Sequence, residues 1–223
     1  MTQKKIGLDR EVIAMRVARE LPDGSYVNLG IGIPTLVSNY VVDNRTIIFQ
    51  AENGVLNYGP AAENEEQDVD LINAGGQFLK PVPGMSFFDS AEAFAMIRGG
   101  HIDITILGAL QVSEQGDLAN WMLPTRGVGN IGGAMDLAVG ADKVIIAMEH
   151  TDRNDQPKIV TSCTYPLTAV RRVSLIVTDV AVIEVGSSGL VLKETAPGWS
   201  IEEIQSITEP VLIIPQDIQE MTL

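Results

Sequence analysis

Apolar side chains recur every fourth position near the start of the chain. Ile13, Val17 and Leu21 hold this spacing, which is typical of a helix with one buried face. Asp9 lies before the first of them and can cap the helix, while the sequence PDG at 22–24 can end it. The pattern therefore predicts a first helix between these two signals.

Beyond this helix, short apolar runs alternate with segments of helical pattern. The predicted strands are 26–30, 46–52, 101–110 and 143–150, followed by 173–185 and 189–194 about a GSSG turn. The predicted helices include 34–42, which Pro34 opens, and 90–100, which Asp89 and Glu92 open. The glycine-rich stretch 127–140 is predicted to open another helix, and Ser200 with Glu203 is predicted to cap the last one. The acidic stretch 62–70 and the stretch 111–126 are predicted as loops.

This alternation favours an α/β fold, a mainly parallel sheet covered by helices on both faces. An antiparallel pair is expected near the C-terminus. No linker or change of composition divides the sequence, so we expect one domain over residues 1–223. In sheets of this kind, ligands bind beyond the carboxyl ends of the strands.

The charge of the chain limits its partners. A formal net charge of −14 would repel phosphate backbones and anionic lipid, so neither nucleic acid nor a membrane surface is expected as a partner. No apolar run has the length of a signal peptide or the roughly 20 residues of a spanning helix, which predicts a cytoplasmic protein. An anionic small ligand remains compatible with this charge if a local feature such as a helix N-terminus binds it.

Several glycine-rich or polar stretches follow predicted strands at one edge of the sheet. One is NLGIGIP after the first strand, and another is Glu52-Asn53-Gly54 after the second. Glu52 has two interpretations: a polar strand end before a common Asn-Gly turn, or a side chain that this turn presents to a ligand. On this residue alone the first interpretation is favoured. Glycine in the facing loops would let a ligand approach the backbone and leave N–H groups free to donate.

Other kinds of site are less well supported. Gly127, Gly129 and Gly132 fit the pattern G-x-G-x-x-G, but the LPTR before them is a poor strand, which disfavours a dinucleotide site. His101 and His150 have no nucleophile signature beside them, so we expect structural roles for both. The acidic stretch lacks EF-hand spacing, and no metal site is predicted.

Six stretches together resemble one family. They are VNLGIGIPT, AENGVLNYGP, DSAEAFAMIRGGHID, QVSEQGDLANW, GGAMDL and AMEH. In combination they are similar to the B subunit of 3-oxoacid CoA-transferases, over roughly residues 10 to 206. Two positions depart from the family's usual SENG…GxGP motif, since Ala51 replaces the serine and Asn57 the first glycine.

The resemblance implies a fold related to that of sugar-phosphate isomerases and a covalent mechanism. Glu52 would attack an acyl-CoA thioester, form a mixed anhydride and then a glutamyl-CoA thioester, and pass the CoA to a second carboxylate. The donor would be succinyl-CoA, acetyl-CoA or similar, and the acceptor a carboxylic or 3-oxo acid such as acetoacetate. The expected substrate-binding or oxyanion residues are Gly30, Gly32, Asn53, Gly54, Gly132, Gly133 and Ala134.

The resemblance also implies a partner chain, the CoA-transferase A subunit, in an α2β2 assembly. No cofactor is expected besides the coenzyme A thioester that serves as substrate, because exchanging one thioester for another is nearly isoenergetic. Two alternatives stay open at this stage. One is an enzyme like the sugar-phosphate isomerases, which have a similar fold, and the other is a ligand-binding subunit without catalysis.

Overall fold

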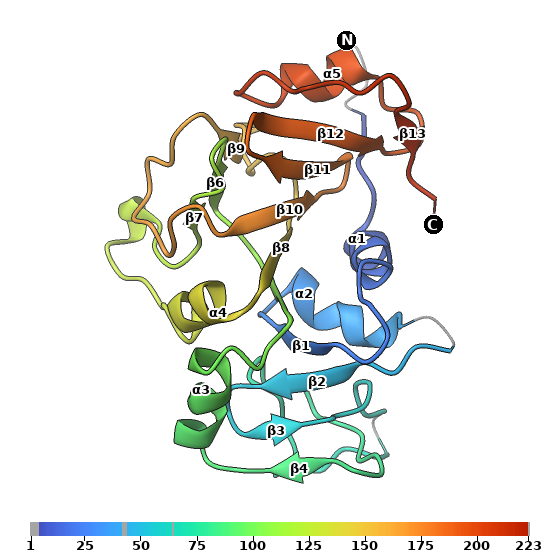
Figure 1. The fold of residues 1–223 in the computed structure, drawn as a ribbon, viewed down its shortest axis with the longest axis vertical. Helices are drawn as coiled ribbons and strands as arrows, with labels where there is room; N and C mark the ends of the chain where they lie inside the picture. The colour runs from blue at the N-terminus through green and yellow to red at the C-terminus, as the bar shows by residue number, and fades with distance from the viewer. Residues whose placement is uncertain (1–4, 42–43, 64, 223) are drawn as a thin grey trace.

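The computed structural model describes residues 5–41, 44–63 and 65–222 (Figure 1). Val42, the last residue of the predicted helix 34–42, and Asn64, within the predicted acidic loop, lie outside the described residues. The other residues of that acidic loop form turns and irregular structure, and nearly all of them are exposed, as predicted.

Parallel strands form the centre of a long sheet. In spatial order they are β10 (Val173–Val177), β8 (Lys143–Ala147), β5 (Ile104–Leu107), β1 (Tyr26–Leu29) and β2 (Ile48–Ala51). Most of their side chains are buried, as expected for strands that are covered on both faces. The predicted mainly parallel sheet is confirmed.

Shorter and mostly antiparallel strands extend this sheet at both edges. They are β3 (Val55–Leu56) and β4 (Ser86–Phe87) beside β2, and β11 (Ala181–Gly186), β12 (Gly189–Thr195) and β13 (Gln219–Glu220) beside β10. The prediction of one strand over 173–185 was wrong, because a turn at Thr178 divides it into β10 and β11. The Thr178 hydroxyl accepts from the backbone N–H groups of Val180 at 3.2 Å and Ala181 at 3.0 Å. These hydrogen bonds stabilise a turn that contains neither glycine nor proline, the usual sequence signals of a turn.

A second sheet occupies part of the predicted loop at 111–126, and that prediction was therefore wrong. Its strands are β6 (Gln111–Ser113), β7 (Leu118–Ala119) and β9 (Ile159–Val160), with β6 at the centre, and a 3₁₀ turn, η2 (Pro124–Arg126), follows β7. Strands of two or three residues are too short to show alternation in the sequence, which explains why they were missed.

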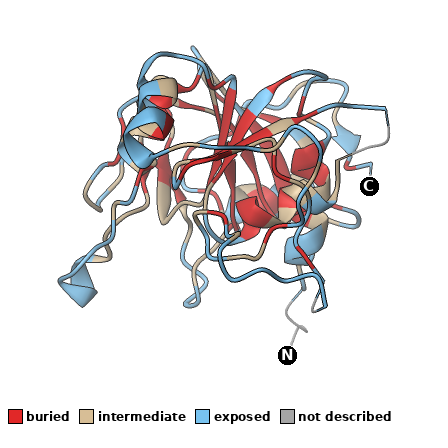
Figure 2. Cartoon of the chain, turned by 90° about the horizontal axis from the view of Figure 1, so that it is seen from below, coloured by how far each residue is buried: buried red, intermediate tan, exposed pale blue. Residues whose placement is uncertain are grey.

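Helices cover both faces of the long sheet, as predicted. One face carries α1 (Arg10–Ala18), α2 (Ile33–Leu36) and the 3₁₀ turn η1 (Val37–Asn39), and the other carries α3 (Ser90–Arg98), α4 (Ala134–Gly140) and α5 (Ile201–Ser206). Figure 1 shows α3 and α4 on one side of the central strands and α1 and α2 on the other. Buried residues follow the strands and the inner sides of the helices (Figure 2).

The helix ends test the predicted caps. Ser200 and Glu203 form a reciprocal capping box, and the Asp89 carboxylate accepts from the N–H of Glu92 at 2.9 Å, as predicted. Asp9 occupies the N-cap position of α1, but its side chain makes no capping bond. The predicted helix 34–42 is also shorter than expected, since it changes to a 3₁₀ turn at Val37.

Among the helices of the described residues, none has both the length and the apolar character needed to cross a bilayer.

Candidate active site

Glu52 lies in a tight turn between β2 and β3. The N–H of Gly54 donates to the carbonyl of Ala51 at 3.0 Å, which closes the turn immediately after the strand. Gly54 has a φ of +114°, and a Cβ there would lie only 1.9 Å from the carbonyl oxygen of Phe88. Only glycine fits this position. The turn therefore holds Glu52 at the carboxyl end of a central parallel strand.

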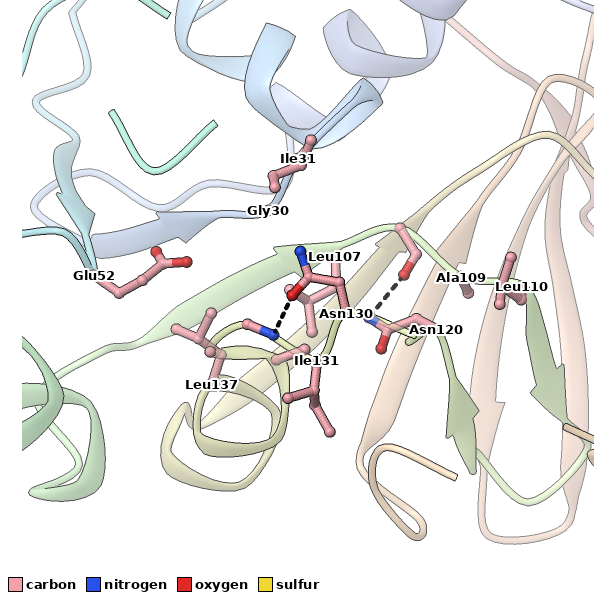
Figure 3. Close-up of a pocket in the computed structure, with 14 residues that line it drawn as sticks. Gly30, Ile31, Glu52, Leu107, Ala109, Leu110, Asn120, Asn130, Ile131 and Leu137 are labelled. Atoms are coloured by element: carbon pink, nitrogen blue, oxygen red, sulfur yellow. Dashed lines mark hydrogen bonds between the residues drawn. The ribbon is translucent and has the colours of Figure 1, made fainter. Parts of the chain in front are cut away.

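A cavity of about 310 Å³ opens at this end of the sheet (Figure 3). Its size is at the lower end of the range for small-molecule sites. The Glu52 side chain points into the space between the end of β1 and the start of α4 (Figure 3). The lining residues are Gly30, Ile31, Glu52, Leu107, Gly108, Ala109, Leu110, Asn120, Asn130, Ile131, Gly132, Gly133, Ala134 and Leu137.

The loop that leads into α4 forms one wall of this cavity. The Asn130 side chain accepts from the N–H of Gly132 at 3.2 Å, and the N–H of Ala134 donates to the carbonyl of Ile131 at 3.1 Å. Within the described chain the N–H of Gly133 has no such partner. A Cβ built on Gly133 would lie 3.5 Å from the Glu52 Cγ. The N–H of Gly133 is thus still available in the part of the loop that lies beside Glu52, within the described chain.

Three of the predicted site residues are not part of the cavity lining. Gly32 precedes α2 with a φ of +96°, and Gly54 shapes the turn described above. The Asn53 side chain donates to the carbonyl of Ile72 at 2.7 Å, so it ties the turn to a neighbouring loop. These residues set the backbone path around the cavity. Their predicted role in binding substrate stays a prediction, as it does for Gly30, Gly132, Gly133 and Ala134, which line the cavity.

Sequence reasoning missed several polar groups at this site. The Asn120 side chain donates to the carbonyl of Gly108 at 3.1 Å and accepts from the hydroxyl of Thr168 at 2.6 Å, which fixes it at the cavity wall (Figure 3). Asn28, on β1, donates to a carboxylate oxygen of Glu52 at 3.2 Å. Both asparagines lie inside the stretches that carry the family resemblance, so a closer inspection of those stretches could have found them.

The structure also places the residues of the less favoured kinds of site. His150 is fully buried between the hydroxyls of Thr178 at 2.9 Å and Thr208 at 2.8 Å, and burial lowers its pKa to about 3, with a smaller effect of Lys158. This is a structural histidine, as predicted. The G-x-G-x-x-G stretch follows η2 and not a strand, so it lacks the context of a dinucleotide-binding turn.

The described residues that line the cavity around Glu52 include no cationic side chain. None of the cavity-lining side chains among the described residues is lysine or arginine. Tyr58, which is buried nearby against Phe49, has a raised pKa, first because of its burial and second because of the negative charge of Glu52. The site therefore offers a carboxylate and backbone donors, but no positive charge from the described lining for an anionic ligand.

Comparison with known proteins agrees with the family resemblance. The chain is 52% identical to the beta chain of a probable coenzyme A transferase of Bacillus subtilis over 201 residues, or 90% of this chain and 93% of that protein. It is 49% identical to the B chain of a succinyl-CoA:3-ketoacid coenzyme A transferase of Helicobacter pylori, covering 90% of this chain and 96% of the relative. It is also 49% identical to the beta chain of an acetate CoA-transferase of Haemophilus influenzae, covering 96% of both proteins.

Solved structures show the same fold at much lower identity. An acyl-CoA transferase of Escherichia coli O157:H7 superposes with a TM-score of 0.74 at 19% identity, covering all of this chain and 45% of that one. The decarboxylase AibA/AibB superposes with a TM-score of 0.68, also at 19% identity, over 96% of this chain and 88% of that one. Because a decarboxylase shares the fold, the fold alone does not determine the reaction.

The family itself follows from the sequence match. The family model for coenzyme A transferase matches residues 10–206, which is most of the chain and agrees with the extent of the resemblance. Together with relatives at about half identity over nearly their whole length, this match decides the assignment. The chain belongs to the coenzyme A transferase family.

Proposed function

We propose that this chain is the catalytic B subunit of a 3-oxoacid CoA-transferase, with Glu52 as the nucleophile. The observation that carries this proposal is the position of Glu52, on a turn that only Gly54 allows and close to Gly133, whose N–H is unpaired within the described chain. The relatives named as succinyl-CoA:3-ketoacid and acetate CoA-transferases support the substrate class: a short acyl-CoA and a carboxylic or 3-oxo acid.

The proposed reaction proceeds in balanced steps. A Glu52 carboxylate oxygen attacks the thioester carbonyl, the C–S bond breaks, and the CoA thiolate leaves a mixed anhydride behind. The thiolate then attacks Cδ of Glu52 and displaces the carboxylic acid as its anion, which gives a glutamyl-CoA thioester. A second carboxylate reverses these steps and leaves as the new acyl-CoA. One thioester replaces another, so the net exchange needs no ATP, metal or redox cofactor.

We further propose that an A subunit of the same enzyme completes the site in an α2β2 assembly. The described lining offers no cation for an anionic CoA, and the chain carries a net charge of −14. A partner that supplies lysine or arginine side chains would solve this problem. Relatives named as B or beta chains support the pairing.

We also propose that residues 1–223 form one domain, because the long sheet combines strands from both halves of the chain. The proposed location of the protein is the cytoplasm.

The function is tested by a transfer assay on the chain co-purified with its A subunit. We expect CoA to move from succinyl-CoA or acetyl-CoA to acetoacetate or acetate, and we expect the chain alone to be inactive with the same pairs. A panel of other donors and acceptors would identify the preferred pair. Isomerisation of sugar phosphates, or acyl-CoA binding without any turnover in the assembled complex, would contradict the proposal.

A further inference from the structure

Two fully buried amide side chains lie behind Glu52, on the face of the sheet that α3 and α4 cover. Asn28 on β1 and Gln50 on β2 both have an exposed fraction of 0%. They are paired in the parallel register, so their side chains project from the same face of the sheet. Burying polar groups is costly unless they are hydrogen-bonded, so these two amides need partners inside the protein.

The amides form a chain of hydrogen bonds that ends at Glu52. Gln50 Nε2 donates to the carbonyl of Ala93 in α3 at 3.4 Å. Asn28 Nδ2 donates to Gln50 Oε1 at 2.7 Å, to the backbone carbonyl of Gln50 at 3.1 Å and to Glu52 Oε2 at 3.2 Å. The chain thus links the backbone of a helix to one oxygen of the candidate nucleophile.

The direction of this chain is fixed at both ends. A backbone carbonyl and an ionised carboxylate can only accept hydrogen bonds, so each end requires a donor. Gln50 must turn its NH₂ group toward Ala93, which leaves its oxygen facing Asn28. Asn28 must then present its NH₂ group to both Gln50 and Glu52. Neither amide can reverse without placing two acceptors against each other.

The carboxylate is confined on its other side as well. A Cβ on Gly133 would be 3.5 Å from Glu52 Cγ and 3.2 Å from the ring of Phe94, so the loop before α4 lies close to the Glu52 side chain. Within the described residues Glu52 Oε1 accepts no hydrogen bond, in contrast to Oε2. The two oxygens therefore differ: one is held from inside the sheet and the other is free.

We propose that Asn28 and Gln50 are positioning residues for Glu52. Asn28 holds Oε2 so that Oε1 is the oxygen that attacks the thioester, and Gln50 acts through Asn28 by fixing the direction of its amide. This inference rests on the proposed function of Glu52 as nucleophile. A misplacement of the nucleophile by about 1 Å can lower the reaction rate on the order of 10²-fold. Buried hydrogen bonds that fix the position of Glu52 should therefore have a large effect on the rate.

A neighbouring side chain provides a matched control. Thr105 on β5 is paired with Asn28 in the register and is also fully buried. Its hydroxyl has no hydrogen-bond partner among the described residues, and neither has Asn28 Oδ1, so Thr105 is not hydrogen-bonded to the chain that reaches Glu52. Thr105→Val replaces that hydroxyl by a methyl group of similar size at the same depth.

The test is a double-mutant cycle in the complex with the A subunit. The variants are Asn28→Leu, Gln50→Leu, the double variant and Thr105→Val, and the measurements are single-turnover formation of the CoA adduct, kcat, KM and the melting temperature. We expect Asn28→Leu to slow adduct formation on the order of 10²-fold, and Gln50→Leu about tenfold, with KM changed by less than about threefold. The double variant should be no slower than Asn28→Leu, because Gln50 acts only through Asn28. Thr105→Val should keep the parental rate.

Several outcomes would overturn the inference. Parental rates in Asn28→Leu, or effects of the two substitutions that multiply in the double variant, would show that the chain does not position Glu52. If the melting temperature shows that Asn28→Leu does not fold, Asn28→Ser replaces it, since a serine hydroxyl is too short to reach Oε2 and should slow adduct formation similarly. The Glu52→Ala variant separates the two proposals. If it still forms the adduct, the proposed function fails; if it is inactive while Asn28→Leu and Asn28→Ser are fully active, only the positioning role fails.

Discussion

Replacing Glu52 by alanine is expected to reduce CoA transfer on the order of 10⁴-fold or more, because the covalent route loses its nucleophile. Glu52→Asp withdraws the carboxylate by one methylene, roughly 1 Å, which should spoil the attack while leaving room for a water that the carboxylate can activate. We therefore expect this variant to lose transfer and to gain some acyl-CoA hydrolysis. Steady-state assays of both reactions, with the A subunit present, measure the two effects.

Glu149 offers a matched control for this pair of variants. It follows the parallel strand β8 at the same edge of the sheet, but it is exposed and pairs with Arg10 at 3.3 Å, outside the cavity lining. Glu149→Ala should keep the parental transfer rate. If Glu52→Asp transfers CoA as well as the parent, Glu52 is only a polar strand end.

Gly133→Val is expected to reduce transfer on the order of 10²-fold to 10³-fold while the protein stays folded. The reason is space and not backbone conformation, because Gly133 has a φ of −88°, which any residue can adopt. A branched side chain would press on the Phe94 ring and on Glu52, and would cover the free N–H beside the carboxylate.

The graded control is Gly133→Ala. Its single Cβ would lie 3.2 Å from Phe94, a tight contact that a small shift of the ring can relieve, so we expect a smaller loss than with valine. Transfer rates and melting temperatures for the two variants measure activity and folding separately. Equal activity of Gly133→Val and the parent would remove this loop from the reaction.

Sequence patterns predicted the structure correctly where a local signal agreed with the contacts that the same residues make in the folded chain. The Glu52-Asn53-Gly54 turn was predictable because Asn-Gly after an apolar run indicates a turn, and the structure adds the reason that no other residue than glycine fits beside Phe88. The central parallel strands were also predictable, since most of their residues are apolar. The capping signals at Asp89 and Ser200 located two helix starts.

The remaining features depend on contacts between distant parts of the chain. Nothing local distinguishes Asn28 from a polar residue on an exposed strand, because its role depends on Gln50 and Glu52 in the neighbouring strand and the turn after it. Asn120 is held by Thr168, 48 positions away, in a segment that lies beside β7, and β7 is too short to recognise from a pattern. The family resemblance located the nucleophile, but the contacts by which other side chains hold it became visible only in the folded chain.

The most direct test of the central claim is to trap and map the covalent intermediate. The complex with the A subunit is incubated with acyl-CoA and no acceptor, digested, and the CoA-bearing peptide is identified by mass spectrometry. We expect CoA to be attached through a thioester to the peptide that contains Glu52, and to be absent from the Glu52→Ala variant. An adduct on another residue, or transfer at the parental rate without any adduct on this peptide, would contradict Glu52 as the nucleophile.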